Sequence, residues 1–173
     1  MQTSLRKSLI ASALALGATF IVPHATAAPE NALHWQSVIG IVQANNVVGS
    51  GSGAVTGGGT PWSALGGKVD AELESGELHF VVHGLALAGG NSIGTPGTIV
   101  QVKGTLVCDT DGSASRGNSV LVDTPLVDLD DQGNARFDGA VGPLPAACTT
   151  EPDIAFLIRV GAGRWIASGT VVR

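Results

Sequence analysis

The fold is decided by residues Thr98–Cys108, which read TIVQVKGTLVC. At a period of two residues, apolar side chains fall on one face of this stretch and polar side chains on the other. The first face carries Val100, Val102, Leu106 and Cys108, with Gly104 between them, and the second carries Gln101, Lys103 and Thr105. The alternation and the β-branched residues predict a half-buried strand whose inner face ends in a cysteine.

The N-terminal segment has the pattern of a signal peptide. A basic start precedes the apolar run Leu9–Val22, and Ala25-Thr26-Ala27 supplies the small residues that signal peptidase recognises. We therefore expect cleavage between Ala27 and Ala28, with residues 1–27 removed and one domain over residues 28–173 in the periplasm or outside the cell. No later stretch is long enough to cross a bilayer as an apolar helix.

Composition points to a small acidic protein built from strands. The net charge is −5, which disfavours nucleic acid or an anionic membrane as partner. Glycine is abundant, at 25 residues, and tyrosine is absent, which favours many short strands joined by turns. The two cysteines, Cys108 and Cys148, would form one disulfide in an exported protein. Such a crosslink would stabilise the fold by about 4 kcal/mol.

About eight or nine strands are expected in the mature chain. They cover Leu33–Val42, Lys68–Leu73, Glu77–His83, Thr98–Cys108, Asn118–Asp123, Leu126–Leu129, Ala135–Val141, Ile154–Val160 and Arg164–Val172. This pattern predicts an all-β fold, a single antiparallel β-sandwich, with a small closed β-barrel as the alternative.

Two pairings follow from the turns between these strands. Leu126–Leu129 and Ala135–Val141 should form a hairpin around Asp130–Asn134. The stretch Ile154–Val160 is apolar on both faces, which predicts a central strand. It should form a second hairpin with the closing strand, in which Trp165 would lie on the core face with Ala167, Gly169 and Val171.

Four short segments of the chain are similar to those of a group of small secreted bacterial all-β proteins. The segments are Gly57-Gly-Gly-Thr-Pro-Trp62, His83-Gly-Leu-Ala-Leu87, Leu144-Pro-Ala-Ala-Cys148 and Arg164-Trp-Ile-Ala-Ser-Gly169. They are packing and turn motifs, so the resemblance supports the sandwich and the disulfide. It brings no activity to this chain.

The acidic turns are the candidate metal ligands. Asp128, Asp130, Gln132 and Asn134 place oxygen atoms at alternate positions, with Gly133 at the turn, which resembles a calcium loop. The weak candidate ligands among them are Asp128, Asp130 and Asn134. The glutamate that closes such a loop is missing, since a glycine stands at the twelfth position, and hairpin turns prefer the same residues. We therefore expect no metal and no cofactor, with calcium as the alternative. Asp109 and Asp111 form a second acidic turn.

Other candidate residues have structural explanations. His79 and His83 share one face of a strand about 13 Å apart, too far to bind one ion, and should point outward. The glycine-rich stretch Gly49–Gly59 lacks the Gly-Lys-Ser or Gly-Lys-Thr of a phosphate-binding loop. Trp62 is expected in the core rather than on a stacking surface.

These observations favour an exported, non-enzymatic β-sandwich that acts as a binding or structural module. The sequence does not identify the partner; a protein or a cell-envelope component is the candidate. No catalytic residue is assigned, because no Gly-x-Ser-x-Gly motif occurs. Two alternatives stay open: a secreted hydrolase with a triad assembled from separated loops, and a calcium-binding extracellular module.

Overall fold

The computed structural model describes residues 31–150 and 153–170. The predicted signal peptide and its Ala27–Ala28 cleavage site lie outside the described residues. In the described part, the chain forms fourteen strands, and five of these have only two residues. The remaining nine strands match the expected number of eight or nine, although one expected strand is divided in two and another, Leu126–Leu129, is only the two-residue β11. No helix in this part is long and apolar enough to span a membrane.

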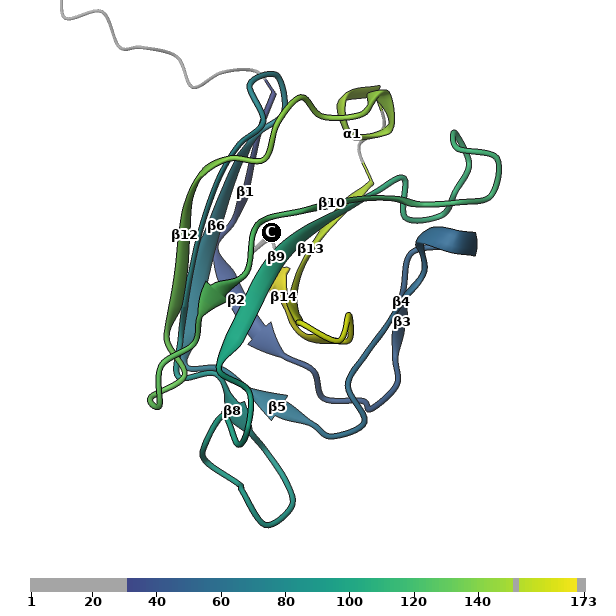
Figure 1. Ribbon diagram of the computed structural model, residues 1–173. Coiled ribbons are helices and arrows are strands. Elements are labelled where there is room, and N and C mark those ends of the chain that lie inside the picture. Colours follow the sequence, from purple (N-terminus) through teal and green to yellow (C-terminus); the bar gives the residue numbers. More distant parts are fainter. Residues whose placement is uncertain (1–30, 151–152, 171–173) are drawn as a thin grey trace, which may run out of the picture.

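Two antiparallel sheets face each other, and neither closes on itself within the described residues (Figure 1). The four-stranded sheet has the order β1 (Ala32–Trp35), β6 (Gly66–Glu72), β7 (Glu77–His83) and β12 (Ala135–Ala140). The six-stranded sheet has the order β10 (Val120–Asp123), β9 (Gln101–Cys108), β13 (Ile154–Val160), β14 (Trp165–Thr170) and β2 (Ser37–Gly40), and β11 (Val127–Asp128) also pairs with β9.

The space between the sheets is filled by apolar side chains from alternate strand positions. Along β7, Leu78, Phe80 and Val82 are buried and the residues between them are not, as expected for a strand with one face on the core. The Phe80 ring packs against Phe156 of β13, with ring centroids 5.6 Å apart. Gly104 lies opposite these rings in β9, because a larger residue there would overlap both of them.

Two strands and one crosslink hold the six-stranded sheet together. β9 and β13 are paired along their whole length, from Ile154 opposite Cys108 to Val160 opposite Val102. β13 lies between β9 and β14, so the prediction that it is central is confirmed. The predicted disulfide is also confirmed: Cys108, at the end of β9, is joined to Cys148 in the short helix α1 (Ala146–Thr150).

A glycine-rich flap, residues 45–58, covers the outer face of the six-stranded sheet (Figure 1). It contains the paired strands β3 (Val47–Val48) and β4 (Val55–Thr56) and the 3₁₀ turn η1 (Gly51–Gly53). Its backbone bonds to Ser119, which accepts from Ser50 N at 2.8 Å through Oγ. Val107, on the outer face of β9, is completely buried, and a Cβ added at Gly49 of the flap would lie 3.0 Å from its Cγ1. A further short pair, β5 (Trp62–Ser63) and β8 (Ala86–Leu87), lies at one end of the sandwich.

Two strand predictions are wrong because the chain changes sheets. The predicted strand Leu33–Val42 is two strands, since β1 belongs to the four-stranded sheet and β2 to the six-stranded one. The exposed residue Gln36 is the corner between them. The predicted hairpin around Asp130–Asn134 does not form as a strand pair, because β11 pairs with β9 and β12 with β7. A turn at the corner of a sandwich and a hairpin turn use the same residue types.

Side-chain facing differs from prediction at two further places. Val100 precedes β9 and is 67% exposed. Trp165 is buried, as predicted, but not on the face of Ala167. A bulge in the β13–β14 pairing puts Ala167 opposite Ile158 and Trp165 opposite the next residue, Arg159. Trp165 therefore lies on the outer face under the flap, where its Nε1 donates to Asn46 O at 3.0 Å.

Candidate functional site

Strand register gathers a polar cluster on the outer face of the six-stranded sheet. In the β9–β13 pairing Lys103 lies opposite Arg159, and in the β9–β10 pairing Thr105 lies opposite Asp123. Residues opposite each other in adjacent strands point to the same face. Three strands that are far apart in sequence therefore bring four polar side chains together.

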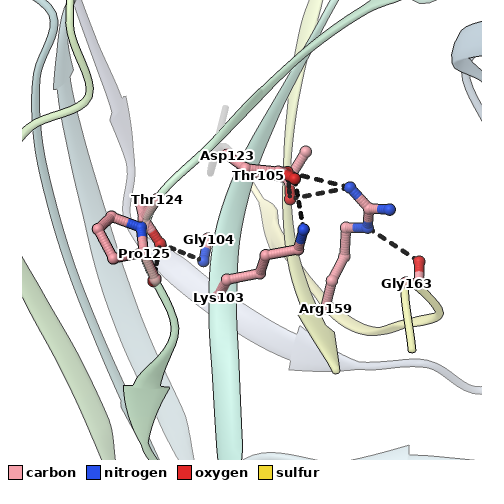
Figure 2. Close-up of polar contacts among 8 residues, drawn as sticks. All are labelled: Lys103, Gly104, Thr105, Asp123, Thr124, Pro125, Arg159 and Gly163. Atoms are coloured by element: carbon pink, nitrogen blue, oxygen red, sulfur yellow. Dashed lines mark hydrogen bonds and ion pairs between the residues drawn. The ribbon is translucent and has the colours of Figure 1, made fainter. Parts of the chain in front are cut away.

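The Asp123 carboxylate is the centre of this cluster (Figure 2). Its Oδ1 accepts hydrogen bonds from Thr105 Oγ1 at 2.6 Å and from Arg159 Nη1 at 3.0 Å, and its Oδ2 accepts one from Lys103 Nζ. Partial burial acts to raise the pKa of Asp123, but the bonds from Lys103 and Thr105 and the charge of Arg159 outweigh it and lower that pKa. The carboxylate is therefore ionised at neutral pH, and the cluster carries two positive charges and one negative charge.

Thr124 fixes the position of Asp123 at the end of β10. Thr124 N donates to Gly104 O, and Gly104 N donates to Thr124 Oγ1, each at 2.9 Å. Thr124 Oγ1 in turn donates to Pro125 O at 2.8 Å (Figure 2). Because both groups are buried, these bonds hold the end of β10 against β9 and keep the Asp123 carboxylate in the cluster.

Two arginines beside this cluster line a hollow of about 330 Å³ between the flap and the β13–β14 turn. Arg159 Nε donates to Gly163 O at 2.9 Å. Arg164 Nη1 donates to Gly57 O at 3.0 Å and to Asn45 Oδ1 at 3.3 Å. Both guanidinium groups are thus held by backbone carbonyls. The residues that line the hollow include no histidine, cysteine or carboxylate: they are Ala54, Val55, Thr56, Arg159, Ala162, Gly163 and Arg164.

The three residues predicted as weak calcium ligands are all engaged in hydrogen bonds. Asp130 Oδ1 accepts from the backbone N–H groups of Gln132 and Asn134, and Asn134 Nδ2 donates to Asp130 Oδ2. The bonds from Asn134 are the main reason that the pKa of Asp130 is lowered. Asp128 Oδ1 instead accepts from Gln101 Nε2. The structure brings Asp130 and Asn134 together as a turn, and directs Asp128 to a different partner.

A different acidic trio converges at the disulfide end of the sandwich. Asp109, Asp111 and Asp153 each place one carboxylate oxygen within 4.8 Å of the others. Asp109 is fully buried, and Asp153 Oδ1 is buried without a hydrogen-bond partner. Burial acts to raise the pKa of Asp109, but hydrogen bonds led by that from the Ser115 side chain lower it. The sequence analysis named Asp109 and Asp111 as an acidic turn. It did not name Asp153, which immediately precedes β13.

Histidines lie on the outer face of the four-stranded sheet. His34, Asp70, His79 and Asp138 form one row across β1, β6, β7 and β12. His34 Nδ1 is 2.7 Å from Asp70 Oδ1, and His79 Nδ1 is 3.7 Å from Asp138 Oδ2. The expected outward direction of His79 and His83 is confirmed.

Trp62 is buried, so the prediction that it belongs to the core is also confirmed. The sequence did not single out Asp123 or Arg159, because each is an ordinary charged residue until the strands are paired.

Comparison of the chain with protein-family models, curated proteins and solved structures finds no match.

Proposed function

We propose that this chain is an exported β-sandwich protein that acts by binding, without a catalytic step. Its binding site is the hollow lined by Arg159 and Arg164. The apolar run Leu9–Val22 and the small residues after it support export. The Cys108–Cys148 disulfide is compatible with an oxidising compartment.

The observation that carries the proposal is the set of residues that line this hollow. It offers two guanidinium groups in fixed positions, and no histidine, cysteine or carboxylate that could serve as base or nucleophile. Elsewhere in the described part of the chain, no histidine is hydrogen-bonded to a serine or threonine hydroxyl, and His34 and His79 are paired with aspartates. Fixed donors in a hollow whose lining includes no histidine, cysteine or carboxylate favour binding over turnover.

Hydrolase screening of the mature protein, residues 28–173, tests this proposal. A panel of ester, amide and glycoside substrates is combined with labelling by a serine-reactive probe. We expect no turnover and no stoichiometric labelling. Labelling of one serine that also abolishes a measured turnover would overturn the proposal in favour of a hydrolase.

Mass spectrometry of protein secreted by a bacterial host tests export, with a mature N-terminus at Ala28 expected.

A second candidate function, calcium binding, is favoured by the acidic trio. The buried Asp153 Oδ1 lacks a donor, and no lysine, arginine or histidine of the described chain forms an ion pair with Asp109, Asp111 or Asp153. Calcium takes carboxylate oxygens as ligands, and a buried oxygen without a partner is costly unless something binds it. Thermal unfolding with calcium or a chelator tests this. A calcium-dependent rise in Tm should be lost in Asp153→Asn and kept in the exposed control Asp131→Asn. Equal Tm values in calcium and chelator would exclude the site.

A further inference from the structure

The cluster and hollow on the outer face of the six-stranded sheet hold an excess of positive charge. Lys103 and Arg159 share the single carboxylate of Asp123, and Arg164 adds a third cation without an acidic partner within 4 Å in the described chain. The protein as a whole has a net charge of −5. A local excess of cations in an acidic protein marks a place where a negative ligand would be favoured.

Each guanidinium group also keeps N–H groups that are not used within the described chain. Arg159 uses Nε and Nη1 for Gly163 O and Asp123 Oδ1, and Arg164 uses Nη1 for Gly57 O and Asn45 Oδ1. The Nη2 group of each arginine has no hydrogen-bond acceptor among the described residues. Arg159 is held at two nitrogens and Arg164 at one, so part of the side-chain entropy of each is already lost before a ligand binds.

Partial burial strengthens the electrostatic attraction of Arg159 for an anion. Its side chain is 12% exposed and that of Lys103 is 20% exposed. Charges in a partly buried site are screened less by water and salt than charges at the surface. Arg164 is exposed and lies at the rim of the hollow. One arginine is therefore part of the floor of the site, and the other is accessible from solvent.

We infer that the hollow binds a small oxyanion, a carboxylate or phosphate group, through the free N–H groups of Arg159 and Arg164. This inference rests on the proposed binding function and names the class of ligand. Planar guanidinium groups match the geometry of carboxylate and phosphate oxygens. The volume of about 330 Å³ is at the lower end of small-ligand sites, and the net charge of −5 on the whole protein disfavours long polyanions.

Titration of the mature protein with two probes tests the inference. Inorganic phosphate and succinate are each added at constant ionic strength, and binding is measured by calorimetry and by the NMR signals of the arginine Nε–H groups. We expect saturable binding that shifts the Arg159 and Arg164 signals. The probe that binds more tightly identifies the group as phosphate or carboxylate. Saturation by neither probe at millimolar concentration would overturn the inference.

Three variants separate a specific site from a general charge effect. Arg164→Gln should weaken binding about tenfold, the usual effect of losing one hydrogen bond to a charged group. Arg136→Gln removes the same charge from an exposed position on β12, in the other sheet, and should weaken binding less than about twofold. Asp123→Asn removes the competing carboxylate and should tighten binding. Equal weakening in Arg164→Gln and Arg136→Gln would overturn the inference.

Failure of the inference and failure of the proposed function can be told apart. A protein that binds neither anion but shows no turnover and no serine labelling contradicts only the oxyanion assignment. A protein with a labelled catalytic serine contradicts the proposed function, whatever the result of the anion titrations.

Discussion

Gly104 tests whether the packing between the two sheets holds the fold together. It lies in the middle of β9, and a Cβ added there would be 2.9 Å from Phe80 Cε1 and 2.9 Å from Phe156 Cε2. Carbon atoms in contact are normally about 3.5–4.0 Å apart. Both rings are completely buried, one in each sheet, so neither can turn into solvent to make room. Gly104→Ala therefore has to push the sheets apart or tilt the rings.

Two opposing effects set the magnitude. Forcing an extra carbon into a packed core costs about 1–3 kcal/mol. Replacing glycine by alanine restricts the unfolded chain, which restores about 0.4–1 kcal/mol where the backbone accepts alanine. The net expected loss is about 1–2 kcal/mol. This is a measurable part of the roughly 5–15 kcal/mol by which a domain of this size is stable.

Urea denaturation of Gly104→Ala, with Gly89→Ala as the control, measures this loss. A Cβ at Gly89 would meet nothing within 4 Å, so that variant should be as stable as the parent or slightly more stable. Adding Phe156→Leu to Gly104→Ala removes one ring and should recover part of the loss, which a double-mutant cycle quantifies. Equal denaturation midpoints for Gly104→Ala and Gly89→Ala would refute the reasoning.

Three further predictions concern the crosslink, the flap and the charged cluster. Replacing Cys108 and Cys148 together by alanine should lower stability by about 4 kcal/mol, and two thiols that alkylate without reductant would contradict the disulfide. Trp165→Ala should cost about 3–5 kcal/mol in chemical denaturation, whereas an unchanged midpoint would place the indole at the surface. The folded state lowers the pKa of Asp123 from 3.8, so its contribution is complete above that pH and is lost as the pH falls below it. Acid unfolding should be less steep in Asp123→Asn, and an identical pH profile would show that the cluster contributes nothing.

Two kinds of strand could be predicted from the sequence. One kind has an apolar face and a polar face, and the other is apolar on both faces. β7 alternates strictly, with Leu78, Phe80 and Val82 inward, and β13 is apolar on both faces. In such strands the burial of side chains determines the register. The point where the chain changes sheets has no such signal, because Gln36 is a polar residue between two short alternating stretches. The sequence around it therefore reads as one strand.

The candidate site could not be predicted, because it depends on register between separate strands. Asp123 was expected only as the end of a strand, and Arg159 only as part of a central one. Their contact requires that β9 lie between β10 and β13 with the pairing that the structure shows. Thr105 belongs to the polar face of the predicted strand, yet it is fully buried and its Oγ1 donates to Asp123 Oδ1. A pattern with a period of two gives the facing of side chains, but not what covers that face.

The flap packs on apolar side chains of the outer face of the six-stranded sheet and also borders the proposed binding site. At Gly53 a Cβ would lie 1.9 Å from Ser119 O, and at Gly57 it would lie 2.2 Å from Ile41 Cδ1, so glycine allows the backbone to approach the sheet this closely. That close approach buries Trp165 and brings Gly57 O within hydrogen-bond distance of Arg164. The glycines in this segment are thus explained by packing and not by phosphate contacts of their own. They place the flap where its edge and the β13–β14 turn together hold both arginines.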